Sequence, residues 1–332
     1  MAHAQQDGRI RLGLCLAAYG GEALPVALEE VAEFGPLCLD LPTDTTAGLI
    51  DAQRCFHDPA YRDEVAATIS GTVGRGWSVT CVSNSRDAQL LLGPHGPHTD
   101  PVLPGTAEEK RSHAVRCSLG TIRLAERLGT RMVRLLVGCP DFSRWLSWWG
   151  SAVSWADNVA EFLSRAEPIL RAARDAGVTV LLEPHPKQIV YDRTSANLVF
   201  TAAARWAGVL ALCVDPANLA ALGYDPATAV AGWGERLAAV HAKDLQRWTG
   251  PSEPTGPGWS RYGPQPPIRF RALGLGALDW PAIVSTLIDE GFGGIVYAEH
   301  EDVLLPRRQG IQQTLRTLRA MLPAGVAEGR TW

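Results

Sequence analysis

The sequence predicts an α/β protein folded as a (β/α)8 TIM barrel, on the strength of three observations. Short apolar runs with strand character alternate with helical patterns along the whole chain. The alternation gives eight strand-then-helix units, the number that closes a parallel barrel. An open dinucleotide-binding sheet would need a G-x-G-x-x-G turn after an early strand, but the glycine pair of residues 274–276 comes late. We therefore expect a single TIM-barrel domain over residues 1–332, with the barrel at about 10–323 and an insertion loop at 245–276.

The eight predicted strands are short and dominated by apolar residues, as expected for strands buried on both faces. They are Ile10–Leu16, Pro36–Leu41, Trp77–Ser83, Arg131–Val137, Val178–Glu183, Val209–Asp215, Leu237–His241 and Gly294–Glu299. The helices that follow them are Leu24–Phe34, Pro59–Arg75, Thr106–Leu128, Asp157–Ala176, Ser195–Trp206, Pro226–Arg236, Asp279–Glu290 and Pro306–Leu322. Local signals support the boundaries: Thr106 and Glu109 have the spacing of a capping box, and Gly129 and Gly177 follow helix ends.

Composition excludes several classes of function. A hydrophobic content of 46% with 20% charged residues is typical of a soluble globular protein with a large core. The formal net charge of −4 offers no cationic surface for nucleic acid. Neither a signal peptide nor an apolar run long enough to cross a membrane is present. Seven cysteines without a C-x-x-C pair are typical of a reducing compartment, so we expect a cytoplasmic protein that binds neither nucleic acid nor membranes.

Potential metal ligands stand at the ends of four successive predicted strands: Glu183, Asp215, His241 and Glu299. The first two separations match the ~31 residues per unit of a ~250-residue barrel, and the third is longer because of the insertion loop. In such a barrel the carboxyl ends of the strands form one face, so these side chains should converge there. A single polar residue at a strand end would not by itself indicate a functional site, but four at successive strand ends predict one.

The donor set favours a hard divalent cation. Three carboxylates and one imidazole suit Mn²⁺ or Mg²⁺ best, with Co²⁺ or Zn²⁺ as further possibilities. We therefore expect a divalent-metal cofactor, with Mn²⁺ as the first choice.

Five segments of the second half of the chain resemble the sugar phosphate isomerase/epimerase family, the xylose-isomerase-like TIM barrels. The segments are VLLEPHP, CVDPANLAALGYDP, VHAKD, FRALGLGALDW and IVYAEHED. The resemblance implies that Glu183, Asp215, His241 and Glu299 are the metal ligands. It also implies that Glu183 and Glu299 form the acid/base pair on opposite faces of a bound sugar. Proton transfer between adjacent carbons through an enediolate would then isomerise the sugar or invert one of its centres.

Further residues are candidates for substrate binding. His185 stands where xylose isomerase has the lysine of E-P-K-P, which implies a substrate-oxygen donor or proton relay; the alternative is a cap on a neighbouring strand end. Arg271 has the family position for gripping substrate oxygens, although a solvated loop arginine fits equally well. Lys243 lies two residues after His241 and should contact substrate or Asp215, whereas Asp244 should hold the insertion loop.

One position departs from the family pattern. The usual D-P-S-H is replaced by Asp215-Pro216-Ala217-Asn218, and Asn218 can hydrogen-bond substrate but cannot carry a proton at neutral pH. Asn84, at the end of the third strand, is a further candidate. Trp145 belongs to a tryptophan-rich loop whose rings could stack on a sugar or aglycone, or form a lid or a subunit contact instead.

The leading hypothesis is a metal-dependent isomerase or epimerase of a ketose or keto-sugar, and an unphosphorylated substrate is favoured. The alternative is a metal-dependent lyase or dehydratase, for example the catalytic subunit of a C-glycoside deglycosidase that eliminates an aglycone from a 3-keto-glycoside. We expect a small-molecule sugar or glycoside substrate and a homo-oligomer, or a complex with a small subunit if the protein is a deglycosidase. A DNA-repair endonuclease would need a histidine-rich zinc cluster and a basic groove, which the sequence lacks. A non-catalytic sugar-binding subunit is a further alternative, in which replacing Glu183 by Gln would leave turnover unchanged.

Overall fold

Eight strands form a closed barrel in the computed structural model, which describes residues 9–71, 76–141, 154–247, 268–323 and 325. The strand order is β1-β10-β7-β6-β5-β4-β3-β2. This order and the helices between the strands confirm the predicted (β/α)8 architecture. By its internal contacts the chain divides into two compact units, Tyr19–Cys213 and the flanking segments Met1–Ala18 with Val214–Trp332.

The unit Tyr19–Cys213 contains a run of five parallel strands. They are β2 (Leu37–Pro42), β3 (Trp77–Asn84), β4 (Met132–Leu135), β5 (Thr179–Leu182) and β6 (Leu210–Val214), each hydrogen-bonded to the next. Its helices are α1 (Leu24–Ala32), α2 (Ala52–His57), α3 (Pro59–Ser70), α4 (Arg86–Gln89), α5 (Ala107–Leu128), α6 (Trp155–Asp175) and α7 (Arg193–Ala202). β2, β5 and β6 are buried at every position, which explains their nearly continuous apolar sequence.

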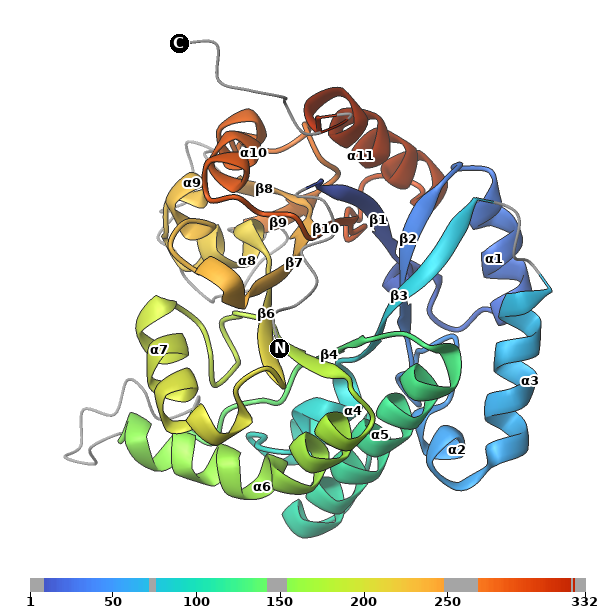
Figure 1. Cartoon of the computed structure of the whole chain (residues 1–332), viewed down its shortest axis with the longest axis vertical. Coiled ribbons are helices and arrows are strands. Elements are labelled where there is room, and N and C mark those ends of the chain that lie inside the picture. Colours follow the sequence, from blue (N-terminus) through green and yellow to red (C-terminus); the bar gives the residue numbers. More distant parts are fainter. Residues whose placement is uncertain (1–8, 72–75, 142–153, 248–267, 324, 326–332) are drawn as a thin grey trace. The chain divides into compact units, whose positions relative to one another are not determined.

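Helix α5 is the central helix of this unit and packs on β3, β4 and α2 (Figure 1). Thr106 and Glu109 form the predicted capping box at its start, with the Glu109 Oε2 accepting from the Thr106 N–H at 2.7 Å. Gly129 ends it in the left-handed conformation (φ 70°). At Gly120 the helix lies so close to α2 that an added Cβ would overlap the carbonyl oxygen of Ala52.

The other unit contains three barrel strands and a hairpin. β1 (Arg11–Cys15), β10 (Ile295–Ala298) and β7 (Leu237–Ala242) pair in parallel in that order. β8 (Asp244–Arg247) and β9 (Ile268–Arg271) form an antiparallel pair. Its helices are α8 (Pro216–Ala221), α9 (Pro226–Ala229), α10 (Trp280–Asp289) and α11 (Arg307–Met321). Within this unit α8 packs on β7 and on the hairpin strand β8, and α11 packs on β10 (Figure 1).

The structure confirms all eight predicted barrel strands and corrects two other expectations. The predicted helix Pro226–Arg236 is a single α-helical turn, α9, followed by a short 3-10 turn at Gly234–Arg236. Gly232 (φ 72°) and Gly234 (φ 56°) adopt backbone angles that a helix does not allow. The insertion at 245–276 is not all loop, because β8 and β9 form its base. None of the described helices has the length and hydrophobicity needed to span a bilayer.

Candidate active site

Asp215 connects β6 to α8, and each of its two carboxylate oxygens has a different partner. Its Oδ1 accepts from the N–H groups of Ala217 (2.8 Å) and Asn218 (3.4 Å), which makes it the N-cap of α8, with Pro216 at the first helical position. Its Oδ2 lies 3.0 Å from Lys243 Nζ. Because Asp215 is fully buried, the cap holds the carboxylate in place and directs the second oxygen at Lys243.

Lys243 joins three carboxylates with its ammonium group. Its Nζ lies 2.7 Å from Glu299 Oε2, 2.6 Å from Glu301 Oε2 and 3.0 Å from Asp215 Oδ2. The lysine side chain is only 4% exposed, so this charge can be accommodated only because carboxylates surround it. The predicted contact between Lys243 and Asp215 is therefore present.

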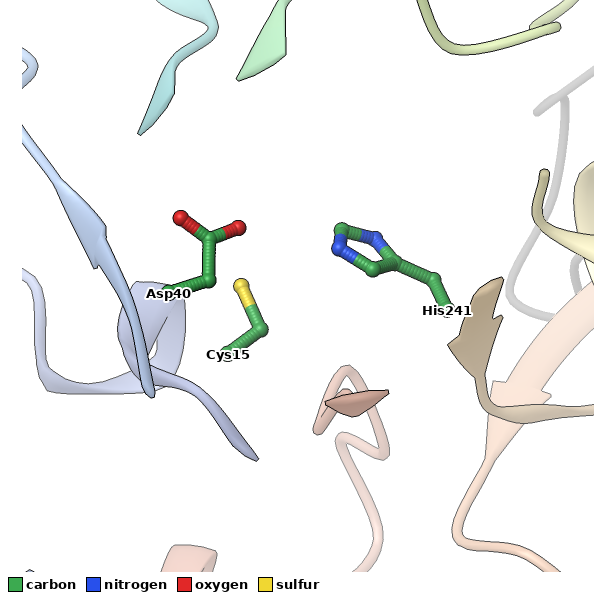
Figure 2. Close-up of side chains that lie close together, drawn as sticks. All are labelled: Cys15, Asp40 and His241. Carbon is green, nitrogen blue, oxygen red and sulfur yellow. The ribbon is translucent and has the colours of Figure 1, made fainter. Parts of the chain in front are cut away.

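His241 lies near the end of β7 and is completely buried. Its Nδ1 is 3.4 Å from Glu299 Oε1, and its ring packs edge-on against Tyr297, its partner in the β7–β10 register. Cys15, the last residue of β1, has its Sγ within 4.8 Å of a ring nitrogen of His241 (Figure 2). Figure 2 also draws Asp40, which belongs to β2 in the other unit.

Three of the four predicted metal ligands therefore form one connected cluster in this unit. Glu299 contacts both His241 and Lys243, and Lys243 contacts Asp215. Two buried carboxylates that pair with one cation, and an imidazole beside one of them, match the donors that a divalent metal prefers. The residues thus fit a metal of the kind predicted, with Asp215, His241 and Glu299 as the residues that would hold it.

The β8–β9 hairpin borders this cluster. The centre of the Phe270 ring lies 4.3 Å from Lys243 Nζ, a cation–π distance, and Phe270 also packs against the buried cluster of Ala217, Ala220 and Leu245. As predicted, Asp244 holds the base of the insertion: its carboxylate accepts from the N–H groups of Gly274 (2.9 Å) and Leu278 (3.0 Å). The hairpin thereby fixes one side of the ammonium group of Lys243.

Arg271 is engaged within the protein. Its Nε donates to Asp302 Oδ2 at 2.9 Å, and its Nη1 donates to Gln246 Oε1 at 3.0 Å. Asp302 is buried, which acts to raise its pKa. Hydrogen bonds from the backbone of Ala272 and Leu304 and from Arg271 outweigh the burial and hold the pKa of Asp302 below its ordinary value. Arg271 therefore ties the hairpin to the loop that follows β10.

In the other unit, Glu183 follows β5 and is paired with a buried arginine on β4. Arg134 Nη1 lies 2.9 Å from Glu183 Oε2 and 3.3 Å from Ser85 Oγ, and Arg134 Nε lies 3.4 Å from Asp40 Oδ2. Arg134, Glu183 and Asp40 are all at least nine-tenths buried. One guanidinium thus pairs with two carboxylates whose charged form burial would otherwise disfavour.

His185 and Asn84 make local contacts in the same unit. The Nδ1 of the half-buried His185 accepts from the Lys187 N–H at 3.3 Å, which orients the ring. Asn84 is buried; its Nδ2 donates to Asp87 Oδ2 (3.1 Å) and its Oδ1 accepts from the Ala88 N–H (2.8 Å), so it caps the start of α4. Trp145 lies outside the described residues.

A second group with metal-ligand side chains, Asp87, His113 and Cys117, lies in this unit and is entirely buried. His113 Nε2 is 2.9 Å from Asp87 Oδ1, and Thr45 and Asn84 donate to the same carboxylate. Burial acts to raise the pKa of Asp87, but these hydrogen bonds lower it below its ordinary value. Burial also raises the pKa of the Cys117 thiol, which disfavours the thiolate that a metal would need. We interpret this group as a hydrogen-bonded link between α4 and α5.

Sequence reasoning missed two residues of the candidate site. Arg134 lies inside an apolar strand-like run, where a lone charged residue is the only available signal. Glu301 belongs to the segment EHED that marked Glu299, but which of its acidic residues faces the site depends on the loop conformation. Arg134 and Glu301 can be identified as residues of the site only from tertiary contacts.

Comparison with known proteins agrees with this architecture. A family model described as xylose isomerase-like TIM barrel matches residues 51–321. The chain belongs to this family. No curated protein sequence gives a significant match.

The xylose isomerase-like chain also resembles many solved structures, three of which are described below. The 3-keto-D-glucoside 4-epimerase YcjR from E. coli superposes with a TM-score of 0.65 at 16% identity, covering 94% of this chain and all of that one. The probable 3-DHS dehydratase AsbF from Bacillus anthracis gives 0.63 at 14% identity, covering 93% and 99%. The IOLI protein, solved with a bound zinc atom, gives 0.63 at 15% identity, covering 94% and 98%. At this level of identity the superpositions establish a shared fold.

Proposed function

We propose that this chain is a divalent-metal-dependent isomerase or epimerase that acts on a ketose or keto-sugar through an enediolate. The observation that carries the proposal is the buried cluster in which Asp215 and Glu299 share the ammonium group of Lys243 and His241 lies beside Glu299. We propose that Glu183, which follows the adjacent parallel strand β5, completes this ligand set, because the carboxyl ends of parallel barrel strands share one face. The epimerase activity of the structural neighbour from E. coli supports the same class of reaction.

In this mechanism the two glutamates exchange protons with neighbouring carbons of the sugar. A bound divalent cation would polarise the substrate carbonyl and the adjacent hydroxyl, which would make the C–H of the hydroxyl-bearing carbon more acidic. Glu183, with its Oε2 fixed by Arg134, removes that proton, and Glu299, with its Oε1 beside His241, returns a proton. Return to the adjacent carbon isomerises the sugar, and return to the opposite face epimerises it.

Substrate binding is assigned to residues beside these glutamates. We propose that His185, oriented by its own loop, donates to a substrate oxygen, and that Asn218 and Lys243 bind hydroxyl groups. Arg271 and Asn84 both have protein partners, so their proposed substrate contacts would come in addition to a structural role. Trp145 is proposed to line the substrate on an apolar face.

The cofactor and cellular setting are part of the same proposal. Mn²⁺ is proposed as the metal, although the zinc atom in the IOLI protein shows that another member of this fold accepts Zn²⁺. We propose the cytoplasm as the compartment, because the seven buried cysteines include no C-x-x-C pair and such usage suits a reducing environment. We propose a homo-oligomer; light scattering of the purified chain would test this.

Deuterium exchange tests the proposed reaction. The Mn²⁺-loaded protein, incubated with a panel of ketoses and keto-glycosides in D₂O, should place deuterium on the carbon next to the carbonyl. Glu183→Gln should abolish incorporation, whereas the control Glu167→Gln, which changes an exposed surface glutamate paired with Arg171, should leave it unchanged. Absence of incorporation with every sugar would refute the proposal.

The alternative is a metal-dependent lyase or dehydratase on the same scaffold. Asn218, which replaces the family's histidine, favours it because an altered proton donor suits a different fate of the enediolate. The structural neighbour from Bacillus anthracis, described as a probable dehydratase, supports this alternative. Release of water, or of an aglycone from a 3-keto-glycoside, would identify this activity, and co-purification of a small subunit would support the deglycosidase form.

A further inference from the structure

We propose that Lys243 competes with the divalent cation for Asp215 and Glu299, and that Glu301 receives its ammonium group when the cation binds. This inference rests on the proposed function, because it assumes that Asp215 and Glu299 hold a metal. It assigns to Lys243 and Glu301 a joint role in setting metal affinity.

The contacts of Lys243 carry the argument. An ammonium group has three N–H donors, and three carboxylate oxygens lie within 3.0 Å of it, on Asp215, Glu299 and Glu301. Two of these oxygens belong to proposed metal ligands. The third, Glu301 Oε2, is the nearest at 2.6 Å and lies outside the proposed ligand set.

Charge makes simultaneous occupancy unfavourable. A divalent cation held by Asp215 and Glu299 would share these carboxylates with Lys243, and like charges that share the same buried carboxylates repel strongly. Metal binding must therefore remove the ammonium group from these two oxygens. The long, flexible lysine stem permits such a movement.

Glu301 and Phe270 are the partners that the ammonium group of Lys243 would keep after it leaves Asp215 and Glu299. The side chain of Glu301 is 45% exposed, against 9% for that of Glu299, so it marks the more solvent-accessible side of the cluster. Phe270 holds the ammonium group from the hairpin at 4.3 Å. A lysine that withdraws from the metal ligands thus keeps a carboxylate and an aromatic ring as partners.

The proposal predicts opposite effects for the two charged residues. Removing the charge of Lys243 removes the competitor, so Mn²⁺ should bind more tightly, by about tenfold if the competition is worth ~1.4 kcal/mol. When the charge of Glu301 is removed, the two remaining carboxylates that pair with Lys243 are both proposed metal ligands, so Mn²⁺ should bind about tenfold more weakly. A lysine that merely supports a bound metal would give the reverse sign for Lys243.

The test is calorimetric titration of the full-length protein with Mn²⁺ alone, at one fixed pH and without substrate. Lys243→Met should lower the dissociation constant and Glu301→Gln should raise it, while the surface control Glu167→Gln should change it less than twofold. In the double variant Lys243→Met/Glu301→Gln the effect of Glu301→Gln should shrink to about threefold or less, because Glu301 acts through Lys243. This variant also removes one charge of each sign, which guards against misfolding of the single variants.

The outcomes separate the inference from the proposed function. Tightening by Lys243→Met together with a Glu301 effect that depends on Lys243 supports the inference. Weaker Mn²⁺ binding in Lys243→Met, or an equal Glu301 effect in both backgrounds, overturns it while leaving the metal proposal intact. Failure of the unaltered protein to bind Mn²⁺ at all overturns both.

Discussion

Replacing Arg134 by methionine should destabilise the protein by about 3–5 kcal/mol, the usual cost of leaving a buried partner charge unpaired. Arg134 is 3% exposed and lies 2.9 Å from Glu183 and 3.4 Å from Asp40. Its loss leaves two buried carboxylates without this cation. For a chain of 332 residues, with an unfolding entropy of roughly 0.7 kcal/mol per kelvin, the expected decrease in Tm is about 4–7 °C.

Urea unfolding followed by circular dichroism would measure this change, with a chelator present so that bound metal does not compensate the charge. The matched control is Arg127→Met. Arg127 Nε is only 2.6 Å from Asp63 Oδ1, but the two side chains are 50% and 62% exposed. Because water screens this pair, its loss should cost less than about 1 kcal/mol despite the shorter distance.

A double-mutant cycle identifies the source of the effect. Glu183→Gln in the Arg134→Met background removes one of the unpaired charges, so the two changes together should cost about 1–3 kcal/mol less than the sum of the single changes. If Arg134→Met costs no more than Arg127→Met, or if the two changes are additive, then the buried pairing does not carry the stability that we assign to it.

Two further predictions concern acid stability and helix packing. The lowered pKa of Asp302 stabilises the fold above its ordinary pKa of 3.8, and this contribution is lost as the pH falls through the lowered value. Asp302→Asn should therefore weaken the pH dependence of the unfolding free energy below about pH 5; parallel profiles would contradict this. Gly120→Ala should cost more than about 2 kcal/mol in urea unfolding because its methyl group would overlap the backbone of Ala52. The control Gly71→Ala, where the methyl has room, should change stability by less than about 1 kcal/mol; equal effects would rule out the packing explanation.

The alternation of strands and helices was readable from the sequence because it is a local property. Each barrel strand is buried on both faces, so its residues form a short apolar run, and each long helix repeats its apolar residues on one face. Short helices such as α4 and α8 were not predicted, because four to six residues carry too little periodicity. The predicted helix Pro226–Arg236 does not continue beyond α9, and propensity alone does not reveal glycines with positive φ.

The positions of the candidate site residues were also predictable in part. A carboxylate or imidazole directly after an apolar strand stands at the carboxyl end of that strand, which placed Glu183, Asp215, His241 and Glu299 before any coordinates were known. The charged partners of these residues could not be predicted from the sequence. The sequence gives no reason to connect Arg134 with Glu183, 49 residues away, or Lys243 with Glu299, 56 residues away.

By itself, then, the sequence determined the kind of fold and the strand ends at which the candidate ligands stand, because both follow from patterns within about twenty neighbouring residues. The tertiary structure decided which cation neutralises which carboxylate, and that Arg271 binds Asp302 and Gln246. Those pairings depend on strand register and on loop conformation, and side chains interact through distances in space that residue numbers do not encode.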